Sequence, residues 1–342
     1  MDNLVVLNRT DLDRLIAKRP GEVKFGERVR VANSDNWLQE VQNTDAKFVL
    51  LGIPEDIGVR ANHGIGGTHT FWKYALGAIL NVQDTNLLKG EELFVLGAFD
   101  LQAQMEKSEN VSIEKLRYLV GEVDNIVYPV IQKIVAAGKV PIIIGGGHNN
   151  AYPILKGASE GLKSPLNCIN LDPHSDYRGM EGRHSGNGFR YAKREGYLEK
   201  YYALGLHENY NGQAIIEEQD DDPDLFFAFF EDIFVREKKT FYDAVRHAMN
   251  KTQGNPVGLE LDMDCLERSL ASAATASGIT AIQARRFATW VAHTIHPAYF
   301  HIAEGAYELR DGKRDSLTPK MAAYLVTDFM KAYLEKRRMK LM

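Results

Sequence analysis

Short apolar runs alternate with amphipathic stretches along most of this 342-residue chain, and this alternation restricts the possible fold more than any other feature. The runs are apolar almost without interruption, so they lack the in-and-out alternation of a half-exposed strand. Strands of that kind are buried on both faces, as in parallel sheets that helices cover on each side. The eight candidate strands are Lys47–Ile53, Glu92–Leu96, Val140–Ile144, Leu166–Leu171, Tyr201–Leu206, Leu225–Phe229, Val257–Leu261 and Tyr299–Ala303.

Helical patterns lie between several of these strands. The clearest covers Ile113–Ala137, with apolar side chains at three- and four-residue steps, Ser112 as a candidate N-cap and Gly138 where a C′ glycine would stand. Another runs over Pro319–Lys336. The alternation predicts an α/β fold, a three-layer sandwich with an eight-stranded, mainly parallel sheet.

No internal repeat, low-complexity segment or shift of composition divides the chain. We therefore expect residues 1–342 to form a single domain, with a core over about 47–310 and a C-terminal helix over about 319–336. The acidic stretch Glu217–Asp224 is interpreted as a solvated loop.

Composition excludes several classes of protein. A hydrophobic content of 44% with 25% charged residues is typical of globular chains and unlike disordered or fibrous ones. A net charge of −5 argues against nucleic acid as the main partner, and no apolar stretch is long enough to span a membrane. The start of the chain has no signal-peptide pattern. With only Cys168 and Cys265, both expected to be small buried residues, a reduced cytoplasmic setting is predicted.

Three polar segments each follow a candidate strand: residues 145–150 (GGGHNN), 172–176 (DPHSD) and 262–264 (DMD). Ligands of parallel α/β sheets collect outside the carboxyl ends of the strands, so these segments are expected to share one crevice. Asp172, His174 and Asp176 recur at every second residue, which places all three on one side of an extended segment.

The segments together offer carboxylates and imidazoles but no thiolate, a set that suits Mn²⁺ better than structural zinc. A single aspartate at a strand end is usually a cap or turn residue, yet all three segments in order predict a metal site. Four converging carboxylates would repel one another unless two divalent cations balanced them, and two such cations can share and activate a water molecule. The predicted ligands are His148, Asp172, His174, Asp176, Asp262 and Asp264.

The same segments resemble the metal-binding signatures of the arginase/agmatinase/formimidoylglutamase (ureohydrolase) family, as do Gly58–Asn62 and Ser185–Asn187. The resemblance runs from about residue 47 to about residue 310. It implies two Mn²⁺ per chain, a mainly parallel eight-stranded sheet and assembly into homo-oligomers. One ion would be held by His148, Asp172, Asp176 and Asp262, and the other by His174, Asp172, Asp262 and Asp264.

Further roles follow from the resemblance alone. Glu304 falls where the family places an acidic residue that orients an amidine or guanidinium, and it follows the last apolar strand; a capping or surface carboxylate is the alternative. Asp264 and Glu304 are the predicted catalytic residues. Ser185 and Asn187 are predicted to bind substrate.

The sequence also departs from the family. Phe189 replaces the histidine that arginases and agmatinases use as a proton shuttle; the nearby His184 could substitute, or it could be an ordinary loop histidine. Gly147 replaces an acidic residue, and Pro173 replaces an alanine.

Two arginines, Arg178 and Arg190, resemble replacements in formimidoylglutamases and are predicted to bind substrate, although either could form a structural salt bridge instead. N-formimidoyl-L-glutamate carries two carboxylates and one amidinium, whereas arginine and agmatine are net positive. Guanidinium groups at the rim would pair with the carboxylates of N-formimidoyl-L-glutamate and would repel the positively charged arginine and agmatine.

The predicted function is therefore a dinuclear Mn²⁺ hydrolase of amidine C–N bonds, with N-formimidoyl-L-glutamate and water giving L-glutamate and formamide. The partner is a small molecule, with neither nucleic acid nor membrane involved. An arginase- or agmatinase-type hydrolase releasing urea is the alternative within the class. A non-catalytic, metal-dependent binding protein is the alternative outside it. His207 is expected in the wall of the site, and residues 62–70 as a glycine-rich loop at its entrance.

Overall fold

A sheet of ten strands runs through the computed structural model, which describes residues 3–33 and 36–341, with backbone alone for 336–341. The order across the sheet is β1-β4-β3-β5-β10-β9-β6-β7-β8, and β2 also pairs with β4. Every pair is parallel except β1 with β4. The strands are β1 Leu4–Val6, β2 Arg30–Val31, β3 Phe48–Gly52, β4 Leu93–Phe99, β5 Val140–Ile144, β6 Leu166–Leu171, β7 Leu198–Leu206, β8 Leu225–Phe229, β9 Val257–Asp262 and β10 Tyr299–Ala303.

All eight strands expected from the sequence are present as β3 to β10, but the expected strand number was wrong because β1 and β2 were missed. These two contain only three and two residues. Segments that short give no periodic pattern, and they are added at the far edge of the sheet, away from the predicted site.

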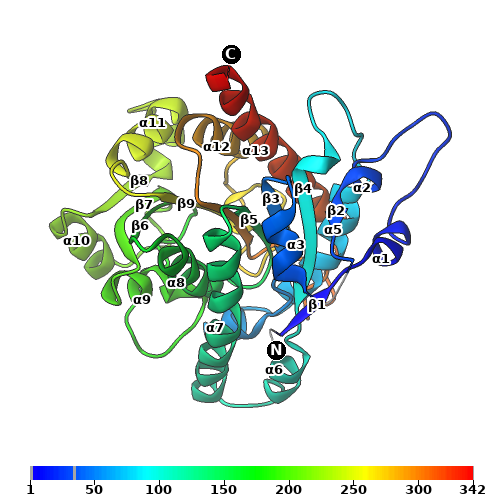
Figure 1. The fold of residues 1–342 in the computed structure, drawn as a ribbon. Helices are drawn as coiled ribbons and strands as arrows, with labels where there is room; N and C mark the ends of the chain where they lie inside the picture. Colours follow the sequence, from blue (N-terminus) through cyan, green and yellow to red (C-terminus); the bar gives the residue numbers. More distant parts are fainter. Residues whose placement is uncertain (1–2, 34–35, 342) are drawn as a thin grey trace.

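Helices cover both faces of the sheet, which confirms the three-layer α/β prediction (Figure 1). In β3, Phe48 and Leu50 enter one apolar cluster, while Val49 and Leu51 enter the other. The first cluster includes side chains of α5 (Phe71–Leu80), α11 (Phe241–Lys251), α12 (Ala281–Ile295) and α13 (Leu317–Leu341). The second includes side chains of α3 (Trp37–Asn43), α7 (Ile113–Ala136), α8 (Ala151–Leu162) and α9 (Gly188–Arg194).

The two helices expected from periodicity are α7 and α13. Ser112 caps α7 by accepting a hydrogen bond from Lys115 N at 3.3 Å, and Gly138 follows its end with φ of +74°. The predicted 319–336 helix lies inside α13. The shorter helices are α1 (Arg9–Asp13), α2 (Phe25–Arg28), α4 (Ile57–Ala61), α6 (Gln102–Lys107) and α10 (Gln213–Asp221).

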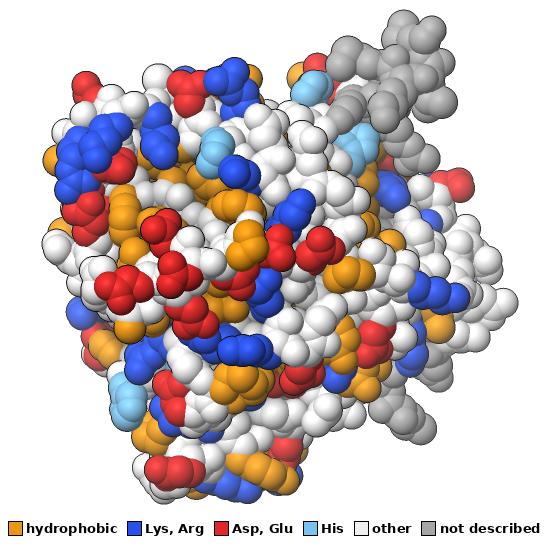
Figure 2. Space-filling view, turned by 90° about the vertical axis from the view of Figure 1, so that its left-hand side faces the viewer, with side chains coloured by type: hydrophobic (Ala, Val, Ile, Leu, Met, Phe, Trp, Pro, Cys, Tyr) orange, Lys and Arg blue, Asp and Glu red, His pale blue; other side chains and the backbone are white. Residues whose placement is uncertain are grey.

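The acidic stretch was wrongly expected to be a loop, since α10 extends through most of it. Gln219 is fully buried, and Ile215 and Ile216 pack against the apolar cluster of the α7 side, so three side chains on one side of α10 anchor the helix despite its charge. The face of the molecule that includes α10 carries a group of acidic side chains (Figure 2).

The middle of the sheet joins segments that are distant in the chain. Strands β10 and β9 lie between β5 and β6, so the chain leaves β5 on one side and enters β6 on the other. Because β5, β10, β9 and β6 are parallel, their carboxyl ends meet at one edge. This crossover point is where ligands bind in open α/β sheets.

Both cysteines are buried, as expected. Among the helices in the described ranges, none has the length and apolar character needed to cross a membrane. The single-domain organisation stays a prediction.

Candidate metal centre

His148 is brought to the centre of the sheet edge by the glycine segment after β5. Gly145 and Gly146 have φ of +90° and +73°, a left-handed backbone that glycine adopts without steric cost, and they turn the chain before His148. The His148 Nδ1 atom lies 3.0 Å from Asp172 Oδ2, 2.9 Å from Asp176 Oδ2 and 3.1 Å from Asp262 Oδ2. Three strand ends thus supply one compact group of possible ligand atoms.

A second group lies beside the first and shares Asp172 with it. His174 Nδ1 is 3.5 Å from Asp172 Oδ1 and 3.2 Å from Asp264 Oδ2. Backbone donors fix the carboxylates, because His174 N donates to Asp172 Oδ1 at 2.6 Å and Asp264 N donates to Asp262 Oδ1 at 2.7 Å. The structure therefore brings together all six residues predicted as ligands.

The chemistry of these atoms fits divalent cations. His148 Nδ1 is buried and faces three carboxylate oxygens, yet among the described residues it makes no hydrogen bond of acceptable geometry, and Asp264 Oδ1 is likewise buried without a partner there. Buried polar atoms in proteins are rarely left without a partner, so each such atom needs an explanation. Metal ions in both groups would use these atoms, since oxygen and imidazole ligands without thiolates suit Mn²⁺.

The carboxylates also repel one another. Burial, followed by the charges of Asp264 and Asp172, raises the pKa of Asp262 well above its usual value. Burial raises the pKa of Asp264 to about 6, although His174 opposes the shift. A site of this kind favours the binding of positive charge, because cations relieve the repulsion.

Two acidic residues of the site have a strained backbone. Asp176 has φ of +45° and Glu304 has φ of +62°, and residues other than glycine rarely adopt this left-handed backbone region. Glu304 follows β10 and accepts a hydrogen bond from His148 N at 2.8 Å, while its own N–H donates to Gly146 O at 3.0 Å. Such strain persists where the surroundings hold a residue firmly, and it concentrates at functional sites.

A cavity of about 560 Å³ opens over the two groups. The metal-site residues His174, Asp176, Asp262, Asp264 and Glu304 line it, and so do the predicted substrate residues Arg178 and Ser185. Residues 62–65 of the expected entrance loop form part of its wall. Asn62 connects the two sides, because its side chain donates to Ser185 Oγ and accepts from Arg178 Nη1, each at 3.3 Å.

Arg190 and Asn187 do not line this cavity. The Arg190 guanidinium is buried against the ring of Tyr177 and forms two 2.6 Å bonds with Glu218 of α10. Asn187 is buried and bonds to Arg183 and to backbone atoms of the 179–184 segment. Both residues hold the loop that carries Arg178 and Ser185, and neither faces the ligand groups.

Phe189 and His184 also lie outside the cavity wall. Phe189 is fully buried, with its ring 5.2 Å from that of His148 and 4.4 Å from that of Tyr201. His184 is buried, not on an exposed loop, and both of its ring nitrogens are occupied by Gly186 N and Glu181. Burial lowers the pKa of His184 to about 4, so this ring is neutral and has no free nitrogen for proton transfer.

Sequence reasoning missed Tyr210, which lines the cavity and stacks on His174 with ring centroids 5.3 Å apart. The Tyr210 ring also stacks on His207, with ring centroids 5.0 Å apart. His207 in turn stacks on Phe230, with centroids 4.4 Å apart. His207 was expected in the wall but lies behind Tyr210. The polar segment after β7 was the available signal, although nothing in it distinguished Tyr210.

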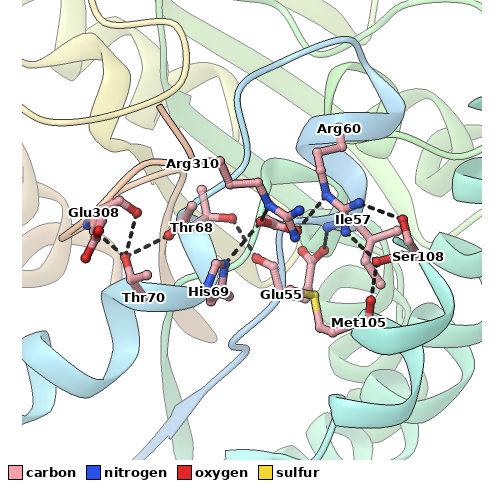
Figure 3. Close-up of polar contacts among 12 residues, drawn as sticks. Glu55, Ile57, Arg60, Thr68, His69, Thr70, Met105, Ser108, Glu308 and Arg310 are labelled. Carbon is pink, nitrogen blue, oxygen red and sulfur yellow. Dashed lines mark hydrogen bonds and ion pairs between the residues drawn. The ribbon is translucent and has the colours of Figure 1, made fainter. Parts of the chain in front are cut away.

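The buried carboxylate of Asp56 joins the loops at one side of the cavity, and it too was missed. Figure 3 shows three of its partners, Arg60, His69 and Arg310, which come from separate segments and meet in one place. Asp56 pairs with Arg60 at 2.8 Å, His69 at 3.1 Å and Arg310 at 2.8 Å. Arg310 also pairs with Glu109. Burial alone would raise the pKa of Asp56, but hydrogen bonds from His69 and Arg310 and the charge of Arg60 lower it well below its usual value.

Its neighbour Glu55 holds the segment that carries His148. The fully buried Glu55 carboxylate accepts from Gly147 N at 2.9 Å and Asn150 Nδ2 at 2.7 Å on that segment, and from Ile57 N at 2.6 Å at the start of α4. Glu55 and Asp56 follow the end of β3. The strand-end rule that found the metal ligands would therefore have found these residues as well.

The fold and the site together define a class: an α/β protein with two adjacent groups of possible metal ligands at the carboxyl edge of a mainly parallel sheet. The chain belongs to the arginase family, whose model matches residues 46–330. This membership confirms the family predicted from the sequence and the enzyme class, a hydrolase acting on C–N bonds of linear amidines.

Individual relatives agree with this assignment. A formimidoylglutamase of Streptococcus pyogenes serotype M5 is 28% identical over 259 residues, which cover 73% of this chain and 71% of the relative. The crystal structure of Trypanosoma cruzi formiminoglutamase with Mn²⁺ has a TM-score of 0.71 at 18% identity, covering 91% of this chain and 98% of that one. Formimidoylglutamase from Bacillus subtilis has a TM-score of 0.72 at 19% identity, covering 92% and 93%. These structures share the fold.

The Asp56 cluster generates a prediction about stability. We expect Asp56→Asn to lower the free energy of unfolding at pH 7 by on the order of 3 kcal/mol, because it leaves the guanidinium groups of Arg60 and Arg310 without their buried carboxylate. The folded-state pKa of Asp56 lies below its unfolded value of 3.8, so its contribution is present above about pH 4 and is lost as the pH falls. The difference between wild type and variant should therefore shrink toward pH 3.

Urea denaturation at several pH values measures this difference. Asp13→Asn, which removes an exposed carboxylate 3.6 Å from Lys18, is the matched control and should change stability by less than about 1 kcal/mol. Equal effects of the two substitutions would contradict the structural role of the cluster.

Proposed function

We propose that this chain is a formimidoylglutamase, which hydrolyses N-formimidoyl-L-glutamate to L-glutamate and formamide with two Mn²⁺ bound. The main support is that residues of two carboxylate–histidine groups line the same cavity as Arg178. The name of the Streptococcus relative and the Mn²⁺ in the Trypanosoma structure support the same choice.

His148, Asp172, Asp176 and Asp262 would hold one ion, and Asp172, His174, Asp262 and Asp264 the other. Asp172 contacts both histidines, and Asp262 accepts a hydrogen bond from Asp264 N, which supports a role for Asp172 and Asp262 in holding both ions. When bound, such a pair of cations lowers the pKa of a shared water molecule and stabilises charge on attacking and leaving groups.

The chain's own residues orient the substrate. Glu304 lines the cavity beside the ligand groups, and its carboxylate is suited to an amidinium. Burial, then the charge of Asp262, raises the pKa of Glu304 well above its usual value, so a nearby cationic group is favoured. Asp264 would hold a proton of the attacking water, while Asn62 and Ser185 offer neutral polar groups to the remainder of the substrate.

Arg178 would pair with a substrate carboxylate. Its guanidinium is half exposed in the cavity wall. In the described part of the chain it has only a 3.7 Å contact with Glu181 and a 3.3 Å bond to Asn62, so it can turn to a ligand. The substrate is net negative, and a guanidinium is a bidentate partner for a carboxylate. Arg190 has no part in this substrate contact, because its guanidinium is paired with Glu218. A cytoplasmic location and a homo-oligomer remain proposals drawn from the sequence.

Product analysis tests the substrate. We expect the Mn²⁺-loaded protein to release formamide from N-formimidoyl-L-glutamate and to release little urea from arginine or agmatine. Asp172→Ala and Asp262→Ala should each abolish turnover and reduce the uptake of two metal equivalents, because both residues belong to the shared part of the centre. Rapid urea release from arginine would contradict the substrate, and ligand binding without turnover on any amidine or guanidine would contradict the enzyme.

Replacing Arg178 tests the charge argument. We expect Arg178→Met to raise KM for N-formimidoyl-L-glutamate about tenfold or more, the value of one charged hydrogen bond, with a smaller change in kcat. A small amidine that lacks carboxylates should be hydrolysed equally by both proteins. The matched control is Arg246→Met on α11, an exposed arginine paired with Asp243. An unchanged KM in Arg178→Met would exclude this residue from carboxylate binding.

A further inference from the structure

Two ionisable side chains lie inside the sheet, directly beneath the metal centre. Glu260 on β9 and His301 on β10 are partners in the register of the two strands, and neither has any exposed surface. His301 Nδ1 lies 2.6 Å from Glu260 Oε2, and Tyr299 donates to Glu260 Oε1 at 2.7 Å. A carboxylate in a buried strand is costly unless it is paired and hydrogen-bonded, and these two contacts meet both conditions for Glu260.

Glu260 also faces the metal ligand His148. While Nδ1 of His148 points at Asp172, Asp176 and Asp262, its other nitrogen, Nε2, lies 3.4 Å from Glu260 Oε2. Within the described residues, Nε2 has no hydrogen-bond partner of its own, which leaves Glu260 as the group that it faces. A metal-binding histidine usually directs its second ring nitrogen at a carboxylate, which fixes the tautomer and the ring orientation.

His301 completes the arrangement as a partner of Glu260 rather than as a metal ligand. Its Nε2 lies 3.2 Å from Gly145 O, on the glycine segment that leads to His148. With Nδ1 on Glu260 and Nε2 on this carbonyl, both ring nitrogens of His301 face oxygen atoms of the protein. Neither is left free for a metal, which argues against a third metal site formed by His148, Glu260 and His301.

We propose that Glu260 and His301 form a positioning pair that holds the His148 ring with Nδ1 free for a metal ion. The pair thereby sets the affinity of the site that His148 shares with Asp172, Asp176 and Asp262. This inference rests on the metal centre of the proposed function.

Glu260→Gln tests the proposal, because glutamine keeps the shape but loses the charge and can turn an N–H toward His148 Nε2. That contact would favour the tautomer with Nδ1 protonated, which cannot bind a metal. We expect the wild-type protein to bind two Mn²⁺ tightly. In the variant, one ion should bind normally and the other 10- to 100-fold more weakly, with the EPR signal of a coupled Mn²⁺ pair replaced by that of a single ion until excess Mn²⁺ restores it.

Calorimetric titration of the metal-free proteins with Mn²⁺ gives the two affinities, and thermal unfolding without metal shows whether the variant is folded. Asp328→Asn, which removes a buried carboxylate paired with Arg285 on the distant α12–α13 contact, is the control and should bind both ions like wild type. If Glu260→Gln does not fold, Tyr299→Phe tests the proposal in its place. This variant removes only one hydrogen-bond donor to Glu260 and should weaken the affinity for the same Mn²⁺ ion two- to tenfold.

Wild-type affinities for both ions in a folded Glu260→Gln protein, or in Tyr299→Phe where that variant decides, would overturn the positioning pair. So would equal weakening of both ions, which indicates a general structural role. A wild-type protein that binds no metal would instead overturn the metal centre itself.

Discussion

Mutual repulsion among the carboxylates at the sheet edge is the constraint on which the other features of the site depend. Four aspartates contributed by β6 and β9 lie around two histidines, and a buried cluster of this kind is unstable unless cations or donors offset its charge. Backbone N–H groups of His174 and Asp264 fix two of the carboxylates. The strained φ values of Asp176 and Glu304 indicate that the surrounding packing, not local preference, holds these side chains in place.

The support for this centre comes from charges placed behind it. Glu55 binds the segment that carries His148, Asp56 joins α4, the glycine-rich loop and the segment after β10, and Glu260 with His301 lies under the His148 ring. In each case a buried acid is satisfied by donors from segments that are far apart in the chain. The metal ligands are thus fixed by hydrogen bonds and ion pairs rather than by apolar packing alone, which suits a site whose ligand atoms must meet within tenths of an ångström.

The sequence was sufficient to predict the layered fold, the eight long strands and all six residues brought together at the centre, because strand-end position and two-residue spacing are local properties. It was insufficient where the outcome depends on a partner elsewhere in the chain. Arg178 and Arg190 look alike in the sequence, but Glu218 of α10 occupies the second and leaves the first in the cavity. Tyr210 could not be singled out within the polar segment after β7, because its role comes from stacking on His174. Glu260 could have been noticed, since a charged residue within an apolar strand is unusual.

The position of β10 has a consequence for how the molecule is made. Along the described residues this strand comes after all the others, yet it lies between β5 and β9 near the middle of the sheet. Until it is synthesised, β1 to β5 and β6 to β9 can form only two partial sheets, each with an unpaired inner edge. Such edges pair readily with other chains, and contacts between distant segments form slowly. The nascent protein is therefore most prone to aggregation just before β10 emerges, and it cannot assemble Glu304 with the other site residues before that moment.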